Sequence, residues 1–126
     1  MTKTINQRMI EALKKEHIEC DFEVIRFEAK DAKTANYMAR YVAGVMNTRD
    51  DDEENPFDPL ELKKYTADDG DYIADVLITC GGPTCSVRYE SRKGTAVVSF
   101  KWGHDYLDVE TENAPITALI EQLTNY

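Results

Sequence analysis

The sequence predicts an α+β fold in which an antiparallel β-meander of about four to five strands packs with three main helices. Helical periodicity appears near both ends of the chain, and several short runs of alternating apolar residues lie between them. Tight turns separate these runs, which favours antiparallel neighbours, and the helices do not alternate strictly with the strands. With 126 residues and 42% hydrophobic residues, the chain is expected to form a single domain spanning residues 1–126.

The first expected element is an amphipathic helix over residues 4–17. Ile5, Met9 and Leu13 recur at four-residue spacing and would lie on one face of the helix. The charged residues between them would face solvent.

A strand and a second helix follow. Residues 21–29 carry apolar side chains in both phases of a strand, which predicts a mostly buried strand with charged ends. Asp31 is a suitable N-cap for a helix over about 32–47. Asn47 is expected to end that helix through a left-handed turn.

An acidic loop and a short helix are expected at about 48–71. Residues 58–61, with the sequence DPLE, have the order of a helix start: a capping side chain, a proline and then a glutamate three residues after the cap. This order predicts a short helix over about 59–65. Residues 68–71, DDGD, predict a turn into the first strand of the meander.

The meander is expected to begin at residue 72 and to end near residue 109. Its predicted strands are 72–80, 85–90, 96–102 and 106–109. Residues 92–94 suit a three-residue hairpin loop with Gly94 in the left-handed region. Residues 113–115 are expected to open a final helix.

Residues 50–75 carry the whole net charge of the chain. They hold eleven acids against Lys63 and Lys64, which equals the net charge of −9, and the remaining residues sum to zero. An acidic surface argues against direct binding to nucleic acid or to an anionic membrane, since both attract Lys and Arg. No apolar run approaches the roughly 18–20 residues of a membrane span, and no signal-type segment is visible, so a cytoplasmic location is expected.

The cysteines do not form the even-numbered framework of a disulfide-rich domain, because Cys20, Cys80 and Cys85 leave one thiol unpaired. Together with His17 they could supply four zinc ligands, although CGGPTC is not a usual zinc knuckle. A dyad of His104 with Cys80 or Cys85 is also conceivable, but no local motif supports it. Reduced thiols, without metal or cofactor, are the expectation.

The acidic segment partly matches the pattern of a calcium-binding loop. Residues 50–61 resemble an EF-hand loop, but Asn55 stands where the loop needs Gly, and Pro59 lies inside it. The sequence also contains no phosphate-binding loop, dinucleotide fingerprint or zincin motif. A non-enzymatic protein with no catalytic residues and no metal ligands is therefore expected.

The candidate site is a partner-binding surface of clustered carboxylates with two aromatic anchors. Its expected residues are Asp50, Asp51, Asp52, Glu53, Glu54, Asp68, Asp69, Asp71, Trp102 and Tyr106. Carboxylates would oppose the rows of Lys and Arg on a nucleic-acid-binding protein, and Tyr and Trp are frequent interface hot spots. The expected partner is therefore a basic protein, and the site requires that the loop and the turn lie on one face.

In size, acidity and lack of a catalytic motif, the chain resembles the phage-encoded inhibitors of bacterial defence. These include anti-CRISPR and anti-restriction proteins that mimic DNA, and the resemblance implies a small inhibitor that acts as a decoy. An immunity protein or antitoxin that neutralises a basic toxin would share the same profile. So would a domain whose acidic loop only aids solubility.

Overall fold

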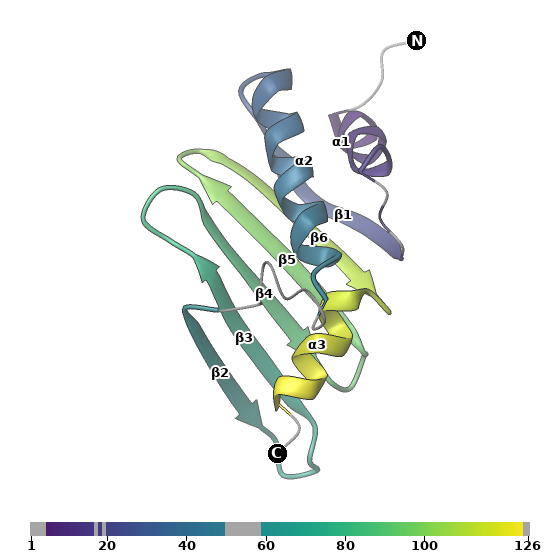
Figure 1. Ribbon diagram of the computed structural model, residues 1–126, viewed down its shortest axis with the longest axis vertical. Coiled ribbons are helices and arrows are strands. Elements are labelled where there is room, and N and C mark those ends of the chain that lie inside the picture. The colour runs from purple at the N-terminus through teal and green to yellow at the C-terminus, as the bar shows by residue number, and fades with distance from the viewer. Residues whose placement is uncertain (1–4, 17, 19, 50–58, 125–126) are drawn as a thin grey trace.

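Six strands form one antiparallel sheet, and three helices accompany it in the computed structural model (Figure 1). The structure describes residues 5–16, 18, 20–49 and 59–124. The elements in chain order are α1 (Ile5–Lys14), β1 (Asp21–Glu28), α2 (Ala32–Met46), β2 (Glu61–Thr66), β3 (Tyr72–Thr79), β4 (Thr84–Glu90), β5 (Thr95–Trp102), β6 (Asp105–Glu112) and α3 (Pro115–Thr124). The strands lie in the order β1-β6-β5-β4-β3-β2. The predicted α+β meander is confirmed, with one strand more than the sequence suggested.

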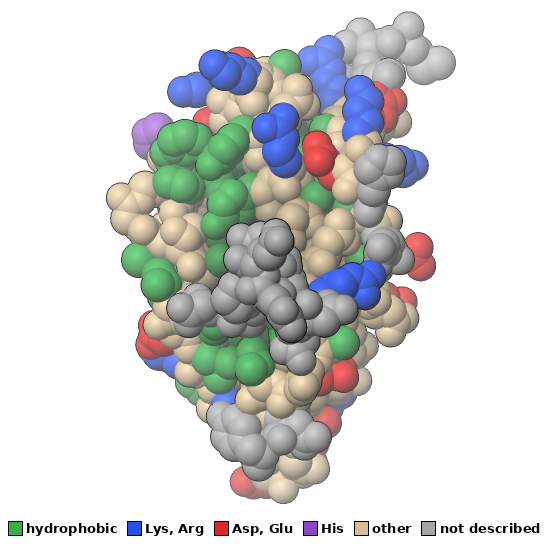
Figure 2. All heavy atoms as spheres, in the orientation of Figure 1, with side chains coloured by type: hydrophobic (Ala, Val, Ile, Leu, Met, Phe, Trp, Pro, Cys, Tyr) green, Lys and Arg blue, Asp and Glu red, His purple; other side chains and the backbone are tan. Residues whose placement is uncertain are grey.

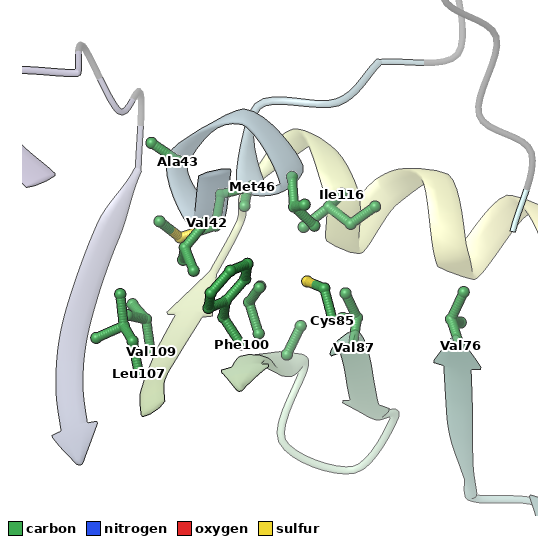
Figure 3. Packing of buried hydrophobic residues seen from close by; sticks show 14 of the residues in the cluster. Val42, Ala43, Met46, Val76, Cys85, Val87, Phe100, Leu107, Val109 and Ile116 are labelled. Atoms are coloured by element: carbon green, nitrogen blue, oxygen red, sulfur yellow. The ribbon is translucent and has the colours of Figure 1, made fainter. Parts of the chain in front are cut away.

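The three helices pack on the same face of the sheet. Buried side chains from each helix, such as Leu13, Val42 and Ile116, join Phe100 and Val87 of the sheet in one hydrophobic cluster. Figure 3 shows the helical and strand side chains of this cluster meeting between the two layers. Since side chains alternate between the faces of a strand, every second strand residue points to the opposite face, which no described helix covers.

Polar contacts attach α3 to the helical side of the sheet. The Tyr89 hydroxyl donates a hydrogen bond to the Glu121 carboxylate at 2.5 Å, and the hydroxyls of Tyr72 and Thr124 are 2.8 Å apart. Burial of Tyr89, followed by its bond to Glu121, raises the pKa of this phenol. These contacts fix the C-terminal helix over β3 and β4.

The short helix predicted over about 59–65 is wrong, because this segment forms strand β2. Leu62 and Lys64 are half-buried, while the residues that alternate with them are exposed. The Leu60 amide donates to the Leu77 carbonyl at 2.8 Å, and the Lys64 ammonium donates to the Thr124 carbonyl at 2.8 Å. The capping order of residues 58–61 is only a local signal, whereas pairing with β3 extends over six residues and satisfies the backbone groups on the inner side of this edge strand.

The prediction that residues 21–29 form a mostly buried strand is also wrong, because β1 is an edge strand. Its pairing with β6 shifts between Val24 and Arg26. This β-bulge returns Phe27 to the core side, which it shares with Val24. Ile25 is left 46% exposed. The two apolar phases in the sequence therefore reflect a bulge rather than burial on both faces.

The ends of the helices follow the sequence in part. The Asp31 side chain caps α2 by accepting the Thr34 amide at 2.7 Å, as predicted. The left-handed turn predicted at Asn47 is wrong, since its φ is −89°. Gly94 adopts the expected positive φ of 67°, and Pro115 begins α3. None of the helices in the described ranges is long and apolar enough to cross a membrane.

Candidate functional site

The acidic loop that the sequence singled out falls in a part of the chain that the structure does not describe. Asp50, Asp51, Asp52, Glu53 and Glu54 all lie outside the described residues. The same holds for most of the segment that resembles a calcium loop. The remaining candidate residues can be placed.

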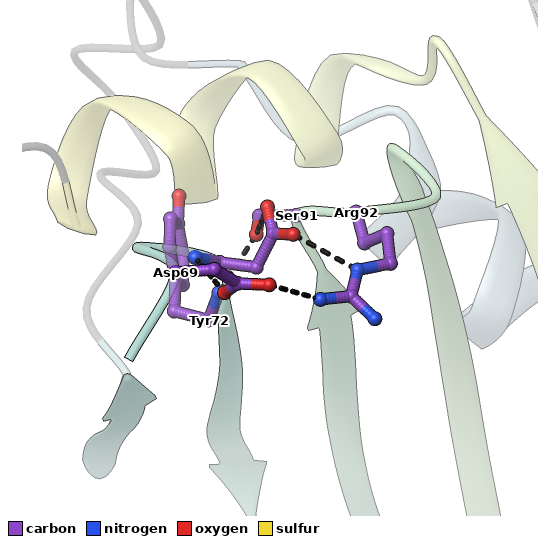
Figure 4. Close-up of polar contacts among 5 residues, drawn as sticks. Asp69, Tyr72, Ser91 and Arg92 are labelled. Atoms are coloured by element: carbon purple, nitrogen blue, oxygen red, sulfur yellow. Dashed lines mark hydrogen bonds and ion pairs between the residues drawn. The ribbon is translucent and has the colours of Figure 1, made fainter. Parts of the chain in front are cut away.

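The acidic turn before β3 is bound to a neighbouring arginine. Arg92 Nε donates to the Asp71 carboxylate at 2.9 Å, and its Nη2 donates to the Asp69 carboxylate. The Asp71 amide donates to Asp69 Oδ1 at 3.0 Å, and the Ser91 hydroxyl accepts the Tyr72 amide at 2.8 Å (Figure 4). Two of the three predicted carboxylates of this turn therefore link it to the β4–β5 turn, and the single positive charge of Arg92 offsets half of their negative charge.

The two predicted aromatic anchors lie on opposite faces of the sheet. Lys101 pairs with Tyr106 across β5 and β6, and Tyr106 faces the uncovered side, where the Arg26 guanidinium lies 4.6 Å from its ring centre. Trp102 belongs to the helical side, and its ring centre is 5.4 Å from that of Tyr37 on α2.

The described candidates also lie at opposite ends of the sheet. The Asp69–Arg92 pair lies before the first residue of β5, and Trp102 is the last residue of that strand. Seven residue steps at about 3.4 Å separate these ends by roughly 24 Å. The structure therefore does not bring the acidic turn, Trp102 and Tyr106 together into one surface.

The uncovered face is divided into a neutralised part and an unpaired part. On β2 to β4, Arg88 binds Asp75 through two hydrogen bonds of 2.8 and 3.1 Å, and Lys63 lies 3.2 Å from Glu61. The bond to Asp75 raises the pKa of Arg88. This half of the face therefore carries opposite charges in contact.

Unpaired carboxylates gather on the outward side of β1 and β6. We call this group the β1–β6 acidic strip; it consists of Asp21, Glu23, Glu28, Glu110 and Glu112. The register places Asp21 opposite Glu112 and Glu23 opposite Glu110. Like charges directly opposite each other destabilise a sheet. Within the described part of the chain, none of the five forms an ion pair, and the one base among them, Arg26, binds Asp108 at 2.9 Å.

Sequence reasoning missed this strip, although a signal for it was present. Asp21 and Glu23 alternate along one predicted strand, and Glu110 and Glu112 alternate near the end of another. Outside residues 50–75 the charges sum to zero, so counting net charge by segment concealed it. Strand pairing joins residues about ninety positions apart, and only the topology shows which strands are neighbours.

Two of the zinc ligands suggested by the sequence, Cys20 and Cys80, are held apart, and His17 lies outside the described residues. Cys20 precedes the edge strand β1 and its sulfur lies 3.0 Å from the Thr111 hydroxyl. Cys80 follows β3, which three strands separate from β1, or roughly 19 Å at 4.8 Å per strand. Among the described residues, no group of three or more His, Cys, Asp or Glu side chains could hold a metal ion.

Cys85 is a poor nucleophile in this fold. Its side chain is fully buried in the core, as Figure 3 shows. Burial raises the pKa of the thiol from 9.0 to about 12, so the reactive thiolate is disfavoured at neutral pH. The dyad of His104 with Cys85 therefore lacks an activated sulfur.

Comparison with known proteins identifies no relative. No protein-family model matches the chain, and neither a curated protein nor a solved structure matches it.

Proposed function

We propose that the chain is a small non-enzymatic inhibitor that binds a basic, nucleic-acid-binding protein through a carboxylate-rich surface. The observation that carries this proposal is the β1–β6 acidic strip, with its two like-charged cross-strand pairs on an uncovered sheet face. In the finer form of the proposal, the chain is a DNA mimic of the phage anti-defence type, such as an anti-CRISPR or anti-restriction protein.

The spacing of the strip supports mimicry of a phosphate backbone. Outward residues on one strand are about 6.8 Å apart, and the register places the β1 and β6 carboxylates directly opposite each other, so the two strands together present two carboxylates per about 6.8 Å, an average of one per about 3.4 Å. One strand of B-DNA carries one phosphate per about 3.4 Å of helix axis. A surface that binds phosphates with Lys or Arg at this spacing would meet carboxylates at a similar density.

The energetic cost of the strip also supports a binding role. Two unit charges about 5 Å apart in water repel by about 0.8 kcal/mol. Glu23 and Glu110 form one such pair, and Asp21 and Glu112 form the other. A fold with a typical net stability of about 5–15 kcal/mol would become more stable if either carboxylate of a pair were replaced. Selection for binding explains why both carboxylates are present in each pair.

The proposal is tested by capturing partners from a bacterial lysate at low and high salt. The double variant Glu23→Lys/Glu110→Lys removes the centre of the strip. Its matched control, Glu61→Lys/Glu90→Lys, makes the same change in net charge on β2 and β4. We expect the unchanged protein and the control to retain a basic partner that is released by salt, and the strip variant to lose it.

Equal capture by the strip variant and its control would refute the assignment of binding to the strip. A parallel variant that reverses residues 50–54 to Lys measures the contribution of the acidic loop separately. The identity of the captured protein then decides between a defence nuclease, as the mimic proposal expects, and a toxin, as an immunity protein would require.

A further inference from the structure

A pocket of about 740 Å³ opens between the start of α2 and the turn that joins β5 to β6. Lys30, Lys33 and Tyr37 line it from one side, and Trp102 and His104 from the other. Its volume lies within the range of about 300–1,000 Å³ that is typical of small-molecule sites. In Figure 2, hydrophobic side chains open to solvent lie beside the histidine, with Lys and Arg side chains above them.

Two aromatic rings form an exposed wall of this pocket. Trp102 is 47% exposed and Tyr37 is 39% exposed. The Tyr37 ring also lies 6.1 Å from that of Phe100, which is fully buried. The exposed rings therefore rest on the core, and a rigid aromatic surface loses little conformational entropy when a flat ligand stacks on it.

Two cations stand beside the rings. Lys30 and Lys33 form no ion pair with any residue in the described ranges. The neighbouring Asp31 carboxylate accepts the Thr34 amide at 2.7 Å, and this bond, helped by the two lysines, lowers the pKa of Asp31. Asp31 caps the helix and also lines the pocket, but among the described residues it forms no ion pair with either lysine, so both ammonium groups can contact an anion.

One more polar group defines the ligand class. Asp105 also lines the pocket, and its carboxylate accepts hydrogen bonds from hydroxyl or amino groups. A ligand that uses the whole pocket therefore needs a planar ring for stacking, an anion for the lysines, and a hydroxyl or amino donor for Asp105. A nucleotide carries all three, and stacking on aromatic side chains with nearby cations is the usual way in which proteins hold exposed bases.

We propose that this pocket binds a mononucleotide, with the base on Trp102 and Tyr37 and the phosphate beside Lys30 and Lys33. The net charge of −9 disfavours a long polyanion, so a free nucleotide is expected rather than an oligonucleotide. The inference goes beyond the proposed function and is independent of it, because it uses none of the residues of the β1–β6 acidic strip.

The chain provides its own probe for this site, since Trp102 is its only tryptophan. Adenosine monophosphate (AMP) is titrated while tryptophan fluorescence is excited at wavelengths that adenine does not absorb. We expect saturable quenching with a Kd of about 1 mM or below. Adenosine, which lacks the phosphate, should bind about tenfold more weakly, and a short single-stranded oligonucleotide should bind no better per nucleotide than AMP.

Matched lysine variants separate the pocket from general charge effects. The variant Lys30→Ala/Lys33→Ala should weaken AMP binding about tenfold, whereas Lys63→Ala/Lys93→Ala, which removes the same charge elsewhere, should leave it unchanged. Failure to saturate up to about 10 mM AMP, equal affinity for adenosine, or equal loss in both lysine variants would overturn the proposal. Tighter binding of the oligonucleotide would overturn the assignment to a free nucleotide.

Discussion

The like-charged pair of Glu23 and Glu110 makes a prediction in which stability and binding change in opposite directions. Replacing Glu23 by Lys turns a repulsion across β1 and β6 into an attraction. With the charges about 5 Å apart in water, each contribution is about 0.8 kcal/mol before screening by salt. The variant should therefore have a higher free energy of unfolding, and it should bind a basic partner more weakly.

Screening sets the size of the effect. The Debye length is about 30 Å at 0.01 M salt, 8 Å at 0.15 M and 3 Å at 1 M. Glu23→Lys should accordingly raise the free energy of unfolding by about 1.4 kcal/mol at about 0.01 M salt, by about 0.9 kcal/mol at about 0.15 M and by about 0.3 kcal/mol at about 1 M. For a chain of this length, 1 kcal/mol corresponds to a Tm shift of about 4 °C.

Thermal unfolding followed by circular dichroism at these three salt concentrations measures the effect. Glu23→Gln removes the repulsion without adding an attraction, so it should raise the Tm by about half as much as Glu23→Lys. Glu61→Lys is the matched control and should lower stability, because it replaces the ion pair with Lys63 by a repulsion. A lower Tm for Glu23→Lys at low salt, or a shift that does not depend on salt, would refute the reasoning.

Three further predictions concern the fold. Because the folded pKa of Cys85 is raised from 9.0 to about 12, its contribution to stability is complete below pH 9 and is lost as the pH rises; about 3 kcal/mol should be lost by pH 11. Urea titrations over this pH range should show that the free energy of unfolding falls less steeply with pH for Cys85→Ala than for the unchanged protein. An equally steep fall in both proteins would contradict the assignment of this pH dependence to Cys85. Gly44→Ala should stabilise α2 by up to about 1 kcal/mol, since the added Cβ meets nothing within 4 Å, whereas Gly94→Ala should destabilise by about 1–2 kcal/mol at its positive φ; chemical denaturation of both variants tests these opposite signs. Arg92→Ala should accelerate hydrogen exchange of the Asp71 amide without changing partner capture, and lost capture would show that this turn belongs to the binding surface.

Much of the fold follows from local patterns in the sequence. The periodicity of the helices, the Asp31 cap and the alternation along β3 to β6 depend on neighbouring residues, so they are readable along the chain. The same locality explains the error at β2. The DPLE cap is a valid helix signal by itself, and only the available edge of β3 makes the extended conformation preferable.

The candidate site was much less predictable. Asp69 and Asp71 stood out as acidic residues, yet their carboxylates bind Arg92, which is more than twenty positions away. Trp102 and Tyr106 are four residues apart, but the hairpin between them places them on opposite faces. Proximity in sequence therefore overstated how far these residues could act together.

The sequence by itself determined the α+β class, the meander, the net charge and the lack of a recognisable catalytic motif, because these depend on composition and short-range pattern. The tertiary structure decided where the unpaired charge gathers. It placed β1 beside β6, and this pairing joined two pairs of alternating acids into the β1–β6 acidic strip. It also brought the start of α2 against the β5–β6 turn to form the aromatic pocket. Both surfaces join segments far apart in the chain, and such contacts are set by packing of the whole core rather than by any local preference.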